Sequence, residues 1–149
     1  MESTDLVKQF QNGTLEKSEW DHRAHLIVAV HFLTQFGPTE ALLELREKIQ
    51  TLNLSHGVFT TETSGYHETR TRTWLALIWS SILQNPEKPD KNSFVEMYRY
   101  HDHVSFHYTA QLLNSWPARS SWVLPDKKPL PLNTNFWPDD TPALFSLER

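Results

Sequence analysis

Histidine is the residue type with which this sequence could do chemistry. The chain has eight histidines against 14 lysines and arginines, and it has no cysteine. His22 and His25 lie three residues apart, and His67 follows a separate polar stretch. Neutral imidazoles bind divalent ions through nitrogen, and helical residues three apart share one face. These three histidines are therefore the candidate ligands of a divalent ion such as zinc, iron or manganese.

Two carboxylates lie next to these histidines in the sequence. Glu68 follows His67 directly, and Glu19 precedes His22 by three residues. A carboxylate beside a metal-bound water can act as a general base, or it can serve as a further ligand. Glu68 is the catalytic candidate on this basis. A plain interaction with the positive end of a helix explains its position equally well.

Four helices are predicted, and two of them carry the three histidines. A capping pattern at Ser18 starts one helix that ends at Gly37, and Pro38 starts the next. Thr63 or Ser64 is the predicted cap of the third. A short polar segment before Ser18 could form a further helix at the N-terminus. The four main ranges are residues 18–36, 38–52, 64–84 and 92–113.

The helix order predicts a shared pocket. Short loops make consecutive helices antiparallel, so the first and third main helices should run parallel, with their N-terminal ends together. His22, His25 and His67 lie in the first turns of these helices and on their apolar faces. All three rings should then point into one space, which His56 and Tyr108 could also reach.

The other histidines are expected to be structural. His101 falls on the inner stripe of the fourth helix and is predicted to be a hydrogen-bonded core residue. His103 and His107 project away from that stripe, at the surface or under the tail. His31 faces away from His22 and is assigned to packing.

The fold class follows from these patterns. We expect an all-α, compact bundle of four to five helices that forms one domain over residues 1–149. Beyond Asn114 the chain has six of its nine prolines and no helical period. This tail should pack in extended form over the bundle, anchored by its tryptophans. They are Trp116, Trp122 and Trp137.

The charge and hydropathy of the chain limit the classes of partner that we expect. The net charge is −4, and lysine and arginine form no run, which argues against a nucleic-acid surface. The first ten residues are polar and no apolar stretch approaches about 20 residues, so we expect a cytoplasmic protein without a membrane segment. A small molecule is the expected partner, and self-association is left open. Trp20 and Tyr66, beside the histidines, could wall its pocket, although a hydrophobic staple explains them too.

The first functional hypothesis is a metal-dependent enzyme acting on a small molecule. The residues do not select among hydrolase, lyase and oxygenase chemistry. One alternative is a metal-free pocket for a carboxylate or phosphate, because paired helix N-termini attract anions and Arg70 and Arg72 could add charge. The other alternative is a non-catalytic sensing or interaction module.

Two strings resemble motifs of a family of small bacterial helical proteins of undefined function. They are the W-x-H-x-x-H-L pattern over residues 20–26 and S-G-Y-H-E-T over residues 64–69. The similarity extends from about residue 10 to Asp126. It implies that the two strings form one unit. The resemblance carries no activity, substrate or cofactor.

Overall fold

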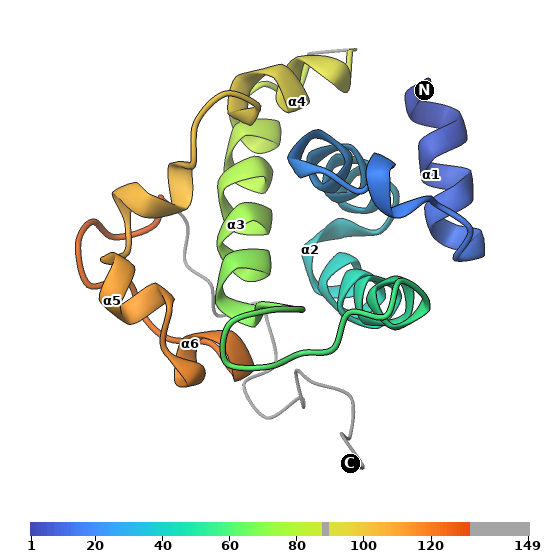
Figure 1. Cartoon of the computed structure of the whole chain (residues 1–149). Coiled ribbons are helices and arrows are strands. Elements are labelled where there is room, and N and C mark those ends of the chain that lie inside the picture. The colour runs from blue at the N-terminus through green and yellow to red at the C-terminus, as the bar shows by residue number, and fades with distance from the viewer. Residues whose placement is uncertain (88–89, 132–149) are drawn as a thin grey trace.

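The computed structural model describes residues 1–87 and 90–131, so Trp137 of the predicted tail lies outside the described residues. Over this part of the chain the structure is helical and contains no strand, which confirms the all-α class (Figure 1). Six α-helices form where four to five were predicted. They are α1 (Ser3–Asn12), α2 (His22–Ser55), α3 (Glu68–Gln84), α4 (Asn92–Tyr98), α5 (Ala110–Leu113) and α6 (Trp116–Ser120), with short 3₁₀ helices at Lys17–Glu19 and His103–Phe106.

Helix α2 consists of two helices joined at a kink. Gly37 has φ 78° and ψ 174°, in a region of backbone conformation that is essentially restricted to glycine. Pro38 follows, and its ring excludes the helical conformation at the residue before it. The break confirms the helix end that was predicted at Gly37. Because of this break, the two halves of α2 point in different directions.

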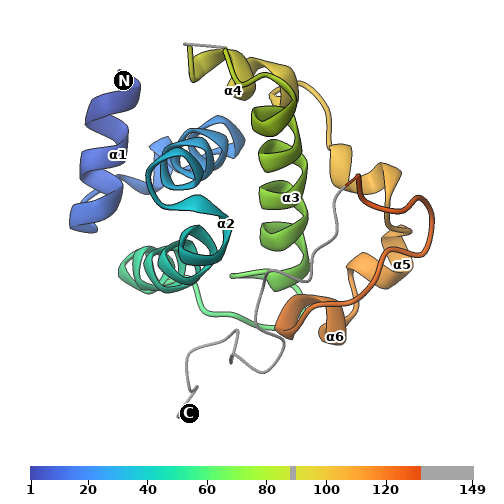
Figure 2. The same cartoon turned by 180° about the vertical axis from the view of Figure 1, so that it is seen from behind.

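Helix α3 packs across both halves of α2. In Figure 1, α3 stands upright while the two halves of α2 are seen nearly end-on, and Figure 2 shows the same arrangement from behind. The prediction that the histidine-bearing helices run parallel was therefore wrong. The reason is the kink, which brings both halves of α2 to the same side of α3. The core between them includes Leu26, Ala29, Leu45, Leu75 and Ile78.

The start of α2 is capped by Asp21 rather than by Ser18. The Asp21 carboxylate accepts a hydrogen bond of 2.8 Å from the backbone N–H of Ala24. This bond satisfies one of the amides that a helix leaves free in its first turn. Ser18 instead belongs to the 3₁₀ helix Lys17–Glu19. The predicted helix start was early by one turn.

The predicted fourth helix is broken into three short pieces. The chain forms α4, the 3₁₀ helix and α5 in place of one helix over 92–113. Val104 and Tyr108 pack into a second apolar cluster on the far side of α3, together with Leu113. Asp126 also anchors Thr109, accepting from its backbone N–H at 2.8 Å and from its hydroxyl at 2.6 Å. These tertiary contacts outweigh the local helical pattern.

The described part of the tail, up to residue 131, packs over α3 on the side opposite α2 (Figures 1 and 2). The Thr69 hydroxyl in α3 donates to the Ser121 carbonyl at 2.8 Å. The Tyr108 hydroxyl donates to the Val123 carbonyl at 2.7 Å. The guanidinium carbon of Arg72 lies over the ring of Trp122, 5.1 Å from the centre of that ring. The described part of the tail therefore covers α3 as predicted, with Trp122 as an anchor, but Trp116 is 40% exposed and the tail begins with the short helix α6.

By length and apolarity alone, α2 is the one described helix that could cross a membrane. Its most apolar 18-residue window has a mean hydropathy of 1.3. Half of that window is buried inside the fold, as is usual in the core helix of a globular protein.

Gly37→Ala should destabilise the protein by about 1–3 kcal/mol, because alanine is strained at the Gly37 backbone conformation. A Cβ at Gly37 would meet no atom within 4 Å, so the loss arises from the backbone alone. Urea unfolding measures it. Gly13→Ala is the control, with φ 70° and ψ 22° in the left-handed region, and should cost about 1 kcal/mol. If Gly37→Ala left the free energy of unfolding unchanged, the kink would not need glycine.

Candidate functional site

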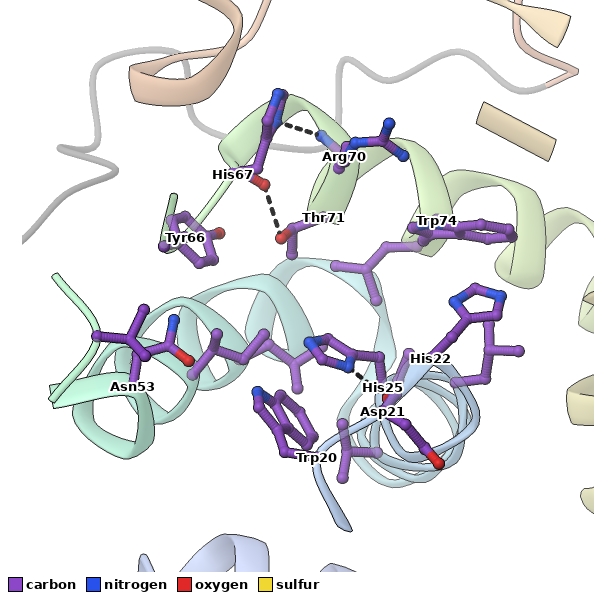
Figure 3. A pocket seen from close by; sticks show the side chains of 18 residues that line it. Trp20, Asp21, His22, His25, Asn53, Tyr66, His67, Arg70, Thr71 and Trp74 are labelled. Carbon is purple, nitrogen blue, oxygen red and sulfur yellow. Dashed lines mark hydrogen bonds between the residues drawn. The ribbon is translucent and has the colours of Figure 1, made fainter. Parts of the chain in front are cut away.

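A cavity of about 490 Å³ lies between α2 and α3 and is closed at one end by the loop before α3. We call it the α2–α3 cavity. Its walls are mostly apolar, with three aromatic side chains and a few polar groups (Figure 3). The apolar and aromatic walls include Trp20, Leu26, Ala29, Leu45, Ile49, Val58, Tyr66, Trp74 and Leu75. The polar lining residues are Asp21, His22, His25, Asn53, His67, Arg70 and Thr71.

His25 projects into this cavity from the first turn of α2. Its Nδ1 lies 2.7 Å from the Asp21 carbonyl oxygen, and its ring stacks on Trp20 with 3.7 Å between ring centres. His25 as a whole residue is exposed. The walls nevertheless remove much of its water, and this desolvation lowers the pKa of His25 to about 4, against the opposing effect of its bond to Asp21. His25 is therefore neutral at pH 7.

His22 lies beside Trp74 rather than beside His25. Its Nε2 is 3.2 Å from the Tyr98 carbonyl oxygen, and its ring centre is 5.2 Å from that of Trp74. A carbonyl oxygen only accepts, so Nε2 carries the hydrogen. Figure 3 shows His22 at the Trp74 end of the cavity.

His67 turns its ring away from the cavity. Its Nε2 donates to the Leu113 carbonyl oxygen at 2.7 Å, and its Nδ1 accepts from the backbone N–H of Arg70 at 3.1 Å. The ring is thus the N-cap of α3, a role predicted for Thr63 or Ser64. The Ser64 hydroxyl instead bonds within the preceding loop, to Thr61 and to the Phe59 carbonyl. Figure 3 shows the His67 ring on the far side of α3 from His25.

The three histidines are thus among the residues that line one cavity, but the predicted meeting of their rings does not occur, because the His67 ring turns away from the cavity. Both nitrogens of His67 are already used in hydrogen bonds, so it has no lone pair for a metal. In residues 1–87 and 90–131, no group of three or more histidine, cysteine, aspartate or glutamate side chains is placed to hold a metal ion. The ligand set expected from sequence spacing does not assemble in this structure.

Glu68 is buried in an ion-pair network and is not among the residues that line the cavity. Its Oε1 accepts from Arg46 Nε at 3.2 Å and from the Tyr66 hydroxyl at 2.7 Å. Its Oε2 pairs with a second Arg46 nitrogen and lies 3.6 Å from Arg72 Nη1. A carboxylate with these partners joins helices together, whereas a general base or fourth ligand was expected. Glu19, the other candidate carboxylate, is exposed and lies outside the cavity lining.

Tyr66 connects this network to the cavity. Its ring forms part of the cavity wall while its hydroxyl donates to Glu68, and burial raises the pKa of Tyr66 well above its usual value. The loop reaches this position through Gly65, where φ is +87° and a Cβ would lie 2.5 Å from the Cα of Thr60. Only glycine fits there.

Arg46 is the important residue that the sequence analysis missed. It lies between Leu45 and Ile49 on the inner face of α2, and it is 5% exposed. The sequence contained a signal for this role, because an arginine beside a buried helical stripe requires a charged partner. Glu68 is that partner, and it holds the pKa of Arg46 above its usual value although burial acts in the opposite direction.

The remaining histidines do not contribute to the cavity. His56 lies outside the cavity lining, with Nε2 2.8 Å from the Leu15 carbonyl oxygen. His101, predicted to be in the core, is exposed because the fourth helix ends before it. His103 packs edge-on against Tyr98, and His107 is buried beneath the tail, with Nδ1 2.8 Å from the Lys128 carbonyl oxygen. The prediction that the tail covers His107 is confirmed.

Arg70 is the one cation that lines the cavity among the described residues. It pairs with Asp102 at 3.2 Å, and both side chains are more than a third exposed. An exposed pair of this kind contributes little to stability. The positive charge of Arg70 is nevertheless largely balanced by Asp102.

Comparisons of the chain with protein-family models, with curated proteins and with solved structures gave no match.

Glu68→Gln should destabilise the protein by about 3–5 kcal/mol, because it removes the buried negative charge that pairs with Arg46 and lies close to Arg72. Chemical unfolding measures the loss. Glu44→Gln is the matched control, since Glu44 forms a partly exposed ion pair with Lys48 at 3.0 Å and should change stability by less than about 1 kcal/mol. Equal effects of the two substitutions would contradict the role given to the network.

Stability should fall as the pH drops from about 6.5 to 4. Burial lowers the pKa of His67 from 6.5 to about 4, so unfolding takes up a proton between these values. This one group should contribute a slope of about 1.4 kcal/mol per pH unit. His67→Asn keeps a side chain that can cap the helix and should remove that contribution in urea unfolding from pH 4.5 to 7.5. The control is His101→Asn, at an exposed position, and an equal slope in both variants would contradict this prediction.

Proposed function

We propose that the protein binds a small, largely apolar molecule in the α2–α3 cavity without using a metal ion. The observation that carries this proposal is the cavity itself, with its volume of about 490 Å³ and its aromatic and aliphatic walls. Ligand sites in proteins commonly have this size and this mixture of many apolar side chains with few polar ones.

The polar groups support binding better than catalysis. His25 is neutral and has one nitrogen left, but a pKa of about 4 makes it a weak base at pH 7. Glu68, the alternative base, is held by arginines outside the cavity lining. A metal-dependent enzyme would need ligands beyond the nitrogens that His22 and His25 retain.

Elemental analysis of protein purified without chelators separates the two hypotheses. The binding proposal predicts far less than one equivalent of zinc, iron or manganese per chain. About one tightly held equivalent, lost in a His25→Ala variant that remains folded, would restore the metal-enzyme hypothesis and overturn the proposal.

Ligand-observed NMR with a set of small aromatic molecules tests binding directly. Some members should bind, and Val58→Trp should abolish their binding by filling the cavity that Val58 lines. Phe59→Trp is the matched control, because Phe59 is adjacent, 61% exposed and outside the cavity lining. Equal binding by both variants would place the ligands elsewhere and contradict the proposal.

A further inference from the structure

The His25 ring has one nitrogen with a hydrogen and one with a free lone pair, and the structure determines which is which. Nδ1 lies 2.7 Å from the Asp21 carbonyl oxygen, which can only accept, so Nδ1 carries the hydrogen. Nε2 is then a hydrogen-bond acceptor, and it has no hydrogen-bond partner among the described residues. Figure 3 shows the ring among the lining side chains, with its one dashed bond directed toward Asp21.

The ring is also held in place. Trp20 stacks on His25, and Phe10 stacks on Trp20 with 5.1 Å between ring centres. Phe10 is 1% exposed and belongs to the core. This stack of three rings fixes the direction of the acceptor, so that binding a ligand needs little reordering of His25.

We propose that the α2–α3 cavity selects uncharged molecules that carry a hydrogen-bond donor, such as a phenol, an alcohol or an amide N–H, for His25 Nε2. This inference rests on the proposed function and names the ligand class of the same site. A ligand that covers Nε2 without giving it a donor takes away the water that the acceptor can bond, so ligands that lack the donor bind more weakly.

Charge in the cavity argues against anions. A carboxylate or phosphate oxygen at Nε2 would face the lone pair, and only a proton on His25 would make that contact favourable. Asp21 also lines the cavity, and its negative charge repels an anion. Arg70, the lining cation, is already paired with Asp102. The anion pocket that paired helix N-termini suggested therefore lacks a free cation among the described lining residues.

Cations are disfavoured as well. The first turn of α2 carries the partial positive charge of a helix N-terminus, which disfavours a cation beside His25. A neutral donor satisfies Nε2 without bringing a charge into a mostly apolar cavity, where charges lose their hydration.

Three naphthalenes of one ring system provide the test. 2-Naphthol carries a hydroxyl donor, 2-methoxynaphthalene has only an acceptor at the same place, and 2-naphthoate carries a negative charge. Dissociation constants are measured by titration calorimetry at pH 6, 7 and 8. We expect 2-naphthol to bind about tenfold more tightly than the methyl ether, with no pH dependence, and 2-naphthoate to bind most weakly.

His25→Phe keeps a ring to stack on Trp20 but removes the acceptor. In this variant 2-naphthol should lose its tenfold advantage, while 2-methoxynaphthalene should bind as it does to the unmodified protein. That second affinity also reports whether the variant retains the cavity. His101→Phe, at an exposed position, is the control and should leave all three affinities unchanged.

The outcomes separate this inference from the proposed function. If all three probes bind equally, the pocket stands and the preference for a donor is wrong. If 2-naphthoate binds best and weakens about tenfold per pH unit, His25 binds anions in its protonated form and the inference is overturned. If no probe binds to the unmodified protein, both the inference and the proposed function fail.

Discussion

One buried carboxylate, that of Glu68, is the interaction on which the rest of the structure depends. It accepts hydrogen bonds from Arg46 of α2 and from Tyr66 of the loop, and it lies close to Arg72 of its own helix. Two guanidinium groups lie against one carboxylate in a buried place, so losing that carboxylate removes a counter-charge from the interior. The network therefore joins α2 to the start of α3, and it holds Tyr66 in position as a wall of the cavity.

The cavity itself follows from the kink in α2. A straight helix of 34 residues would present one line of side chains to α3, but the break at Gly37 places both halves against it. His25 and Leu26 reach the cavity from the first half, and Leu45 and Ile49 reach it from the second. The break at Gly37 thus brings side chains from both halves of α2 to the wall of one cavity.

The three candidate histidines show that hydrogen bonding, rather than spacing, decides the chemistry of an imidazole. His67 uses both nitrogens to cap α3 and to bond the Leu113 carbonyl. His22 donates to the Tyr98 carbonyl and packs on Trp74. His25 alone presents an unused nitrogen within a fixed ring stack, so it is the side chain to which we assign ligand recognition.

The sequence by itself determined the helical class and the break at Gly37. These depend on local rules of periodicity and backbone conformation. Tertiary structure alone decided the directions of the His22 and His67 rings, because the carbonyls that orient these two rings are distant in the chain, whereas His25 bonds the nearby Asp21 carbonyl. The Tyr98 carbonyl is 76 residues from His22, and the Leu113 carbonyl is 46 residues from His67. No local pattern encodes such a partner, so the predicted ligand set could be named from the sequence but its geometry could not.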